Sequence, residues 1–253
     1  MPIEFKTKPG LVVYLTAGDP DLATTRDIAL AALDNGADVI ELGVPFSDPL
    51  ADGPVIQRAS ERAVAKGTRL TDVLGLAKEL RTARPQAGII LFSYLNPVLR
   101  LGMKEFCAKA AEVGADGVLL TDMIVEEAAE YLDAMHANKL APVFLAAPTS
   151  PDARLKAIAE CSQGFVYAIS RTGITGTQSH LTSDAADVVT RLKQFTKLPV
   201  VVGFGISNAG HVKAVGEFAD AAVVGSAIVQ LIEKTAPDEA AKTVGRFVAE
   251  LRA

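Results

Sequence analysis

Two carboxylic acids that lie close together in the sequence point to acid–base chemistry. Glu41 lies inside the apolar run Val39–Val44, and Asp52 follows in a loop rich in proline and glycine, between Ala51 and Gly53. A charged carboxylate in an apolar strand is costly unless it is paired, hydrated or used in a reaction. Two acids brought together by a strand end and its loop can do opposite tasks if their surroundings separate their pKa values. The pair therefore predicts acid–base catalysis.

The elements that position these acids alternate regularly along the chain. Strands that alternate with helices indicate right-handed βαβ units and a parallel sheet buried on both faces. Eight units favour a closed (β/α)8 TIM barrel over an open doubly wound sheet. The turn after the first strand, Thr16–Pro20, also lacks the glycine pattern of a dinucleotide site. The predicted strands are Leu11–Thr16, Val39–Val44, Ile89–Tyr94, Gly117–Thr121, Pro142–Ala146, Phe165–Ile169, Pro199–Gly203 and Ala221–Val224.

Helix-periodic segments rich in alanine, leucine, glutamate and lysine separate these strands. They include extra helices beyond one per strand, and no linker or change of composition divides the chain, so we expect one barrel domain over residues 1–253. The predicted helices are Thr24–Asn35, Val55–Lys66, Thr71–Arg81, Lys104–Val113, Glu126–Asn138, Asp152–Cys161, Asp184–Phe195, Ala209–Phe218, Ser226–Lys234 and Asp238–Leu251.

Three joints between a helix and the next strand share a short pattern that ends in alanine and aspartate. They read Asn35-Gly36-Ala37-Asp38, Val113-Gly114-Ala115-Asp116 and Glu217-Phe218-Ala219-Asp220. Gly36 and Gly114 fit the left-handed position that follows the last residue of a helix.

In a barrel of this type, chemistry belongs at the carboxyl ends of the strands. Glu41 shares one face of its strand with Val39 and Gly43, and the opposite face is wholly aliphatic. The aliphatic face should meet the helices, so Glu41 should point into the barrel mouth. A structural acid paired with an arginine is the alternative for Glu41. For Asp52 the alternative is a helix N-cap before Pro54.

Glycines cluster after the last three predicted strands. The segments are Thr172–Gly176, Gly203–Asn208 and Gly225–Ala227. Glycine lets backbone N–H groups approach an anion closely, and Ser207 or Asn208, and Ser226, could cap helices whose N-termini favour negative charge. Tight turns are the alternative for each segment, but three in adjacent units favour a phosphate site.

Several catalytic classes lack their residues. No predicted strand contains a lysine, so a Schiff-base mechanism has no obvious nucleophile. The histidines, His136, His180 and His211, are widely spaced, and we expect helix-surface positions for the first and third and a loop position for the second. No metal site of the usual kind is therefore expected. Acid–base catalysis by carboxylates without metal or cofactor remains, and Tyr167 is a candidate to assist it.

The segment Ser170–Asp184 is long for a loop between a strand and a helix and is rich in small polar residues. It is either a surface loop or a lid that closes over the substrate, and its position beside the glycine clusters favours the lid.

Composition limits the setting in which the chain works. Hydrophobic residues make up 49% and charged residues 22%, and the formal charge of −5 comes without a basic block, which argues against nucleic acid. No apolar run is long enough for a signal peptide or a membrane span. Two cysteines in 253 residues suggest a reducing compartment. We expect a cytoplasmic protein with no membrane association.

The chain resembles the α subunit of tryptophan synthase over nearly its full length. The run from Glu41 to Pro49, followed by Ala51 to Gln57, is similar to the signature of that family. Similar motifs occur at Thr16–Pro20, Tyr94–Pro97, Ser170–Gly176 and Gly203–Ser207. The resemblance implies a (β/α)8 barrel that cleaves indole-3-glycerol phosphate to indole and glyceraldehyde 3-phosphate by a retro-aldol reaction.

The resemblance also implies roles for individual residues. Glu41 matches the acid that protonates the indole ring, and Asp52 matches the carboxylate that accepts the indole N–H. Thr175 matches the lid residue that orients that aspartate. Further matches in the substrate pocket are Tyr14, Tyr94, Tyr167 and Phe204, and matches in the phosphate cradle are Gly176, Gly205, Gly225 and Ser226.

The family implied by the resemblance works in an αββα heterotetramer. Its β subunit carries pyridoxal phosphate and receives indole through a tunnel, and Asp48, Pro49 and Gly173 match positions near the contact.

Two departures from the family pattern stand out. Met1–Gly10 is too short for the extra N-terminal helix, and Tyr14 replaces a common phenylalanine. Two rival functions remain: a lyase that needs no partner, and a regulatory subunit without catalytic activity. An indole-glycerol phosphate synthase would require a catalytic lysine in a strand, and no predicted strand contains one.

Overall fold

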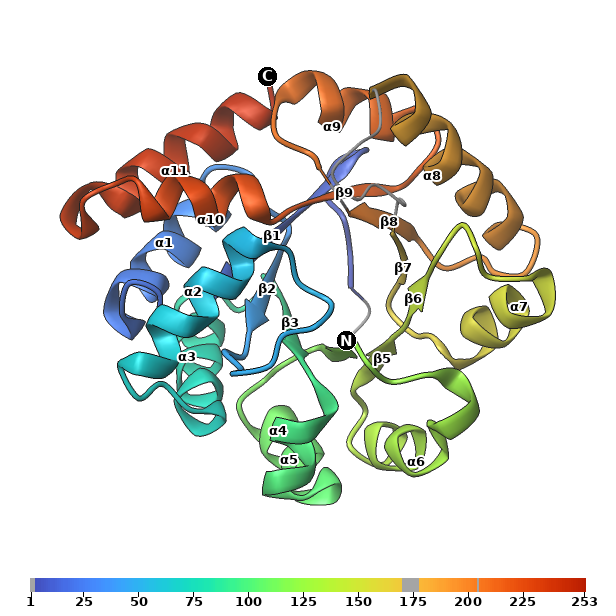
Figure 1. Cartoon of the computed structure of the whole chain (residues 1–253), viewed down its shortest axis with the longest axis horizontal. Coiled ribbons are helices and arrows are strands. Elements are labelled where there is room, and N and C mark those ends of the chain that lie inside the picture. Colours follow the sequence, from blue (N-terminus) through green and yellow to red (C-terminus); the bar gives the residue numbers. More distant parts are fainter. Residues whose placement is uncertain (1–2, 170–177, 204) are drawn as a thin grey trace.

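Parallel strands form the centre of the molecule in the computed structural model, which describes residues 3–169, 178–203 and 205–253, with only the backbone of 178–183 (Figure 1). In this described part nine strands are hydrogen-bonded in the order β5-β4-β3-β2-β1-β9-β8-β7-β6. Because β5 and β6 are joined directly through Phe144, the chain itself completes the ring. The strands are β1 (Gly10–Thr16), β2 (Val39–Gly43), β3 (Gly88–Ser93), β4 (Gly117–Leu120), β5 (Ala141–Val143), β6 (Leu145–Ala146), β7 (Val166–Ile169), β8 (Val200–Gly203) and β9 (Ala221–Val224).

Helices surround this ring of strands on the outside (Figure 1). The fold is therefore the predicted TIM barrel with extra helices. The helices are α1 (Leu22–Asp34), α2 (Pro54–Ala65), α3 (Leu70–Ala83), α4 (Leu95–Leu101), α5 (Met103–Glu112), the 3-10 helix η1 (Val125–Glu127), α6 (Ala129–Ala137), α7 (Asp152–Cys161), α8 (Gln178–Leu192), α9 (Ala209–Gly216), α10 (Ser226–Glu233) and α11 (Pro237–Leu251).

Four elements differ from the sequence prediction, and one of them is the predicted helix Glu126–Asn138, which forms η1 and α6. The fifth predicted strand is interrupted at Phe144 and forms β5 and β6. Helix α4 was not among the predicted helices. Its Pro97 lies in the first turn, where a proline loses no intrahelical hydrogen bond. Helix α8 begins at Gln178 and not at Asp184, so His180 belongs to a helix and the predicted loop is shorter. Residues 170–177 of that loop lie outside the described residues.

The two faces of each strand have different neighbours, as the alternation predicts. Ile40 and Leu42 belong to the large cluster between the strands and the helices. Val39 and Ile90 belong to a separate cluster inside the barrel. Glu41 lies on the same face of β2 as Val39, so the prediction that it points into the barrel is confirmed.

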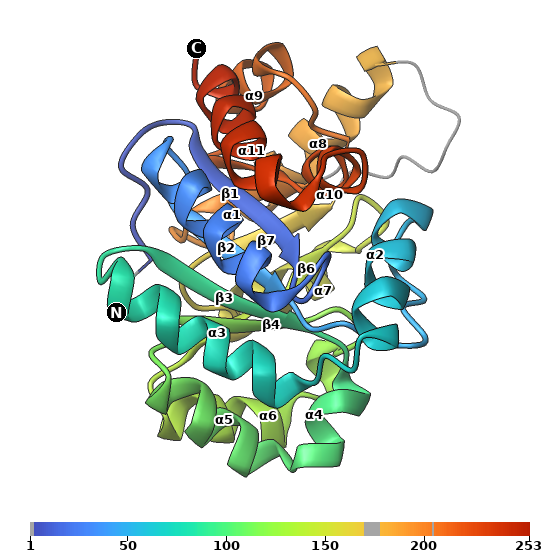
Figure 2. The ribbon, with the colours of Figure 1, turned by 90° about the vertical axis from the view of Figure 1, so that its left-hand side faces the viewer.

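The segment before β1 covers the amino end of the barrel. No helix forms within residues 3–9, as predicted, and Ile3 and Phe5 pack instead against Phe165 and other interior residues. Gly10 and Gly164 make room for them, because a Cβ on either would lie within 2.7 Å of their side chains. Figure 2 shows the segment before β1 on the opposite side of the molecule from α2, so the floor is separated from the carboxyl ends of the strands.

The repeated alanine–aspartate joints tie neighbouring strands together. Asp116, just before β4, accepts a hydrogen bond from the N–H of Ile89 at the start of β3 (2.8 Å) and pairs with Arg81 (2.6 Å). Asp38 and Asp220 do the same for the strands beside them. Each carboxylate satisfies a backbone donor at the end of a sheet ladder and is itself balanced by a cation. The motif is therefore a structural brace at the amino end of the barrel.

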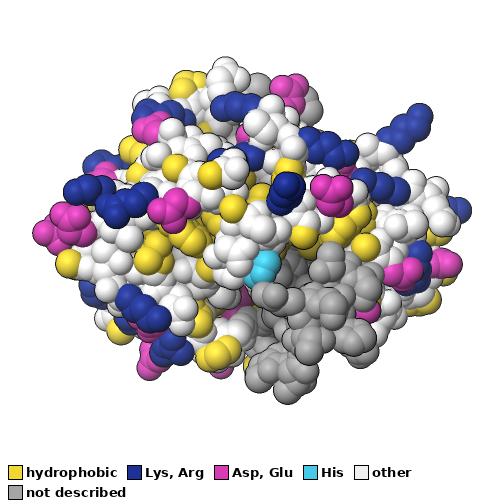
Figure 3. Space-filling view, turned by 90° about the horizontal axis from the view of Figure 1, so that it is seen from above, with side chains coloured by type: hydrophobic (Ala, Val, Ile, Leu, Met, Phe, Trp, Pro, Cys, Tyr) yellow, Lys and Arg dark blue, Asp and Glu magenta, His cyan; other side chains and the backbone are white. Residues whose placement is uncertain are grey.

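The surface carries mixed charge. Figure 3 shows acidic and basic side chains interspersed over the face that it presents. Among the helices of the described part of the chain, none is long and apolar enough to cross a membrane.

We predict that Asp116→Ala lowers the free energy of unfolding by about 2–4 kcal/mol, because it leaves the Ile89 N–H and the Arg81 guanidinium without their carboxylate. Urea unfolding followed by circular dichroism measures the loss. Glu105→Ala is the matched control, since Glu105 forms only an exposed pair with Lys109 on one helix, and it should cost less than about 0.5 kcal/mol. Equal losses in the two variants would contradict a bracing role.

Candidate active site

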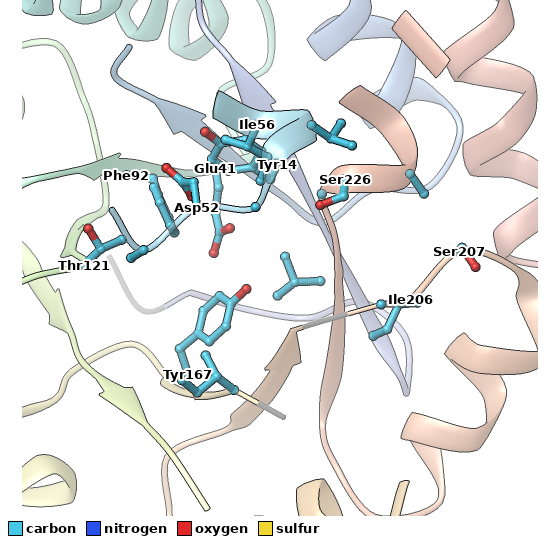
Figure 4. A pocket seen from close by; sticks show the side chains of 18 of the residues that line it. Tyr14, Glu41, Asp52, Ile56, Phe92, Thr121, Tyr167, Ile206, Ser207 and Ser226 are labelled. Atoms are coloured by element: carbon cyan, nitrogen blue, oxygen red, sulfur yellow. The ribbon is translucent and has the colours of Figure 1, made fainter. Parts of the chain in front are cut away.

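A pocket of about 440 Å³ opens at the carboxyl ends of the strands (Figure 4). Strands β1, β2, β3, β6, β7 and β9 contribute to it, together with the amino ends of α2 and α10. Most of its lining is apolar, with a few polar groups that converge, which is the usual composition of a small-molecule site. The lining residues are Tyr14, Glu41, Ala51, Asp52, Gly53, Val55, Ile56, Phe92, Thr121, Leu145, Tyr167, Ile169, Gly205, Ile206, Ser207, Val223, Gly225, Ser226, Ala227 and Gln230.

Glu41 is the most unusual group in the pocket. Its side chain is fully buried, and neither carboxyl oxygen has a hydrogen-bond partner among the described residues. The structural alternative, an arginine partner across the barrel, is therefore absent from this part of the chain. Burial raises the pKa of Glu41 to about 8, because the apolar surroundings disfavour the charged form. At neutral pH Glu41 holds a proton and points towards the middle of the pocket (Figure 4).

Asp52 lies in the loop between β2 and α2 and is only partly buried. The Tyr94 hydroxyl donates to Asp52 Oδ2 (3.0 Å) and accepts a hydrogen bond from the N–H of Ala51 (2.9 Å). Burial raises the pKa of Asp52 to about 6, and the hydrogen bond from Tyr94 opposes part of that rise. Asp52 is not the helix cap of the alternative interpretation, because α2 begins after Gly53, which has no side chain.

The two acids therefore differ in the way that the sequence suggested. Between pH 6 and pH 8 the fully buried Glu41 is neutral and the partly buried Asp52 is ionised. One group can donate a proton while the other stabilises positive charge. Their pKa values differ because Glu41 is more deeply buried than Asp52 and because only Asp52 accepts a hydrogen bond from the Tyr94 hydroxyl.

Two tyrosines form part of the wall beside Glu41. Tyr14 is the register partner of Glu41 on β1, and its hydroxyl occupies the space where a Cβ on Gly43 would lie. The Tyr167 hydroxyl occupies the corresponding space over Gly203. Burial raises the pKa of both phenols, so they stay neutral. Gly203 therefore admits a tyrosine ring, which is a different use from the phosphate contact suggested by its motif.

The amino end of α10 is the best anion site in the pocket. Its N-cap is Gly225 and not the predicted cap Ser226, which is the first residue of the helix, and no side chain among the described residues caps this end. The first N–H groups of α10 are thus left for a ligand. At α9, by contrast, Asn208 caps the helix by accepting a hydrogen bond from the N–H of His211 (2.9 Å). Gly205, with φ of +70°, has open space around it and lines the pocket between these helices.

The remaining predicted site residues fall into two groups. Asp48 and Pro49 lie at the surface in the loop between β2 and α2, outside the pocket lining. The other predictions lie outside the described residues, namely Gly173, Thr175, Gly176 and Phe204. His136 is exposed on α6, as predicted. No group of three His, Cys, Asp or Glu side chains gathers in a metal-binding arrangement within the described ranges.

Several pocket residues were not singled out from the sequence. Phe92 lies two positions after the interior residue Ile90 on β3, so strand alternation could have placed it in the pocket. Its ring contacts that of Tyr14 edge-on, with centroids 5.1 Å apart. Val55 and Ile56 had no such signal, because only the packing of α2 over the barrel mouth turns them inwards.

We predict that Glu41→Gln stabilises the protein in a pH-dependent way. Unfolding releases the Glu41 proton between pH 4.5 and 8, because the pKa is about 8 in the folded state and 4.5 in the unfolded state. The wild type therefore loses stability relative to Glu41→Gln as pH rises through this window, by roughly 3 kcal/mol at pH 7.

Urea unfolding of both proteins at pH 5 and pH 8 tests the prediction. Glu105→Gln, at an exposed glutamate, is the control and should show no such pH-dependent difference. A difference between Glu41→Gln and wild type that stays constant from pH 5 to pH 8 would show that Glu41 ionises normally.

Comparison with known proteins agrees with this geometry. The model of the family "Tryptophan synthase alpha chain" matches residues 3–252. The tryptophan synthase alpha chain of Burkholderia pseudomallei (strain 1106a) is 48% identical over 246 residues, covering 97% of this chain and 91% of the relative.

Solved structures give the same result. A chain of the tryptophan synthase a2b2 complex from Pyrococcus furiosus has a TM-score of 0.91 and 40% identity, with 97% of this chain and 98% of that chain covered. A chain of tryptophan synthase from M. tuberculosis has a TM-score of 0.87 and 34% identity, with coverages of 97% and 94%. Because the similarity extends over nearly the whole sequence and the whole barrel, this chain belongs to the tryptophan synthase alpha chain family.

Proposed function

We propose that this chain cleaves indole-3-glycerol phosphate to indole and glyceraldehyde 3-phosphate by acid–base catalysis with two carboxyl groups. The observation that carries the proposal is the neutral, fully buried Glu41, which has no partner in the described structure and faces the pocket. Asp52 and the uncapped end of α10 line the same pocket. A proton donor, an anion and a phosphate site are what this substrate needs.

Glu41 acts as the proton donor in this proposal. Protonation of the indole ring carbon that bears the side chain weakens the bond to the glycerol carbon, and the electrons of that bond return to the ring as it breaks. The neighbouring hydroxyl becomes the aldehyde and loses its proton. Overall one proton moves from a hydroxyl to a carbon, so one carboxyl group that donates and then accepts is regenerated. Glu41, protonated near neutral pH, suits this task.

Asp52 stabilises the charged ring in this proposal. The protonated indole carries positive charge that its N–H shares, and an ionised carboxylate beside that N–H lowers the barrier. The hydrogen bond from Tyr94 holds Asp52 in place and favours its ionised form. Thr175 as a second orienting group stays a prediction, as does a pocket contact of Phe204.

The phosphate group of the substrate binds at the amino end of α10 in this proposal. Gly225 and Ser226 present backbone N–H groups there, and Gly205 borders the same space. A helix N-terminus favours an anion without any lysine or arginine. Gly176 as a further phosphate contact stays a prediction.

We also propose that the chain works with a tryptophan synthase β subunit in an αββα assembly. The Pyrococcus furiosus structure is named as an a2b2 complex. In the described part of the chain, large apolar side chains are exposed after each of the adjacent strands β2, β3 and β4: Leu50 is 92% exposed, Leu99 56% and Ile124 45%, and Val64 near the end of α2 is a further one at 40%. Exposed apolar side chains in segments that follow neighbouring strands suit a protein interface. Leu50 follows Asp48 and Pro49, and Gly173 stays a predicted contact.

The cofactor and the compartment are parts of the same proposal. The reaction as written uses no metal or cofactor in this chain, and pyridoxal phosphate belongs to the β subunit. Both cysteines are free thiols, which agrees with the cytoplasmic location predicted from the sequence.

Two rival functions lead to different observations. A lyase that needs no partner would release indole at the same rate with or without a β subunit. A regulatory subunit without catalysis would not need Glu41 in a neutral, buried state, so the observed burial favours an enzyme.

We predict that Glu41→Gln and Asp52→Asn each lower indole release by about 10²–10⁴-fold, because each removes a group that acts in the transition state. Both changes keep the size of the side chain, so the fold should persist by circular dichroism. Indole release is measured on the full chain, alone and with a β subunit. The control is Tyr131→Phe. It removes a hydroxyl that donates a hydrogen bond to the Val118 carbonyl away from the pocket. Substantial indole release by either acid variant would refute the assignment.

We predict a bell-shaped pH dependence of kcat/KM. Activity should rise as Asp52 ionises near pH 6 and fall as Glu41 loses its proton near pH 8. Tyr94→Phe should move the acid limb to higher pH, since the Tyr94 hydrogen bond lowers the pKa of Asp52, and leave the alkaline limb in place. Steady-state assays from pH 5 to pH 9 measure both limbs. An alkaline limb that persists in Glu41→Gln would exclude Glu41 as the acid.

A further inference from the structure

A network of four charged side chains connects three parts of the barrel behind the pocket. Asp19 lies in the loop after β1, Arg58 and Arg62 lie on α2, and Glu233 ends α10. The charges alternate along the network and sum to zero. None of the four residues lines the pocket.

The network begins at the buried side chain of Asp19. Only 4% of this residue is exposed, and its two oxygens accept hydrogen bonds from Arg62 Nε and Nη2 at 2.8 and 2.7 Å. The neighbouring carbonyl of Pro20 also accepts a hydrogen bond from Lys66, just after α2. The carboxyl-terminal end of α2 is thus fixed to the loop that follows β1, a strand of the barrel wall. A bidentate pair of this kind constrains direction as well as distance.

The network continues from α2 to α10. Glu233 accepts a hydrogen bond from Arg62 Nη1 at 2.8 Å and two from Arg58 at 2.9 and 2.8 Å. The hydrogen bonds from Arg58, followed by the one from Arg62, lower the pKa of Glu233 to about 2, so it is ionised at all working pH values. A carboxylate at the carboxyl end of a helix is disfavoured by the helix dipole. Glu233 therefore stabilises the contact between two helices and not α10 itself.

The same two helices both present their amino ends to the pocket. Helix α2 starts directly after Asp52 and Gly53, and α10 starts at Ser226. Figures 1 and 2 show α2 and α10 next to each other. A helix of eight residues spans about 12 Å, so Glu233 is far from the proposed phosphate position at the amino end of α10 but is connected to it by the helix. A change at Glu233 can therefore alter the relative placement of the two substrate-binding ends.

We propose that Arg62 and Glu233 are positioning residues that set the distance between the phosphate-binding end of α10 and the Asp52-bearing end of α2. The inference rests on the proposed function, in which one substrate reaches from α10 to Asp52. Misplacement of reacting groups by about 1 Å can lower a rate by ~10²-fold. Exposed ion pairs contribute little to stability on average, so a positional and a purely structural role predict different results.

The test uses Glu233→Gln, which keeps the size of the side chain but removes the charge that holds both arginines. Asp34→Asn is the matched control: Asp34 also ends a helix, α1, and also forms a bidentate pair, with Arg84 at 2.8 and 2.7 Å, but away from the pocket. Arg62 is left unchanged because its loss would leave Asp19 buried and unpaired. Cleavage kinetics of the full chain are compared with the dissociation constants of two probes, glycerol 3-phosphate and indole.

The expected result is a fall in kcat/KM of roughly 10- to 100-fold for Glu233→Gln, mostly in kcat. Each probe should bind as in the wild type, because each needs only one of the two helices. Asp34→Asn should behave as the wild type in every measurement.

Two results would overturn the inference while the proposed function stands: kinetics of Glu233→Gln equal to those of Asp34→Asn, or an equal loss in kcat/KM and in affinity for both probes. The second result would mean that the pocket has collapsed as a whole. A wild-type chain that releases no indole, alone or with a β subunit, would overturn the proposed function and this inference together.

Discussion

The rest of the structure has to accommodate the burial of one carboxyl group, that of Glu41, inside the barrel. Glu41 is surrounded by apolar strand residues and lacks a partner among the described residues, so it can fold into place only as a neutral acid. Keeping a proton on this carboxyl group at neutral pH lowers the free energy of unfolding, and other interactions in the fold must offset that loss. The group that can donate a proton at neutral pH therefore also destabilises the folded barrel at that pH.

The two ends of the barrel divide stability and chemistry between them. At the amino end, Ile3 and Phe5 close the floor and aspartates such as Asp116 satisfy strand N–H groups with a cation at their side. At the carboxyl end, the described residues provide neither a partner for Glu41 nor a side-chain cap for the first turn of α10. Groups left unsatisfied at one end are those that a substrate can satisfy, and the fully paired groups at the other end compensate for them.

Part of this arrangement follows from local pattern. The alternation of strands and helices was sufficient for the barrel, and the alternation within β2 was sufficient to turn Glu41 inwards. Local pattern failed where the neighbours are distant in sequence. The interruption of the fifth strand at Phe144 and the inward turn of Ile56 depend on packing between elements. The use of Gly203 depends on Tyr167 of the adjacent strand, which no turn motif records.

The sequence by itself determined the fold, the family and the two acids, because strand alternation and a long contiguous motif are local properties of the chain. Only the tertiary structure decided the protonation of those acids, since the pKa values of Glu41 and Asp52 depend on burial and on the Tyr94 hydroxyl, 42 residues from Asp52. It also decided which helix end is free for an anion and that Glu233 joins α10 to α2. The pKa of each acid depends on its burial, on nearby charges and on hydrogen bonds, and the groups that supply them come together only when the barrel closes.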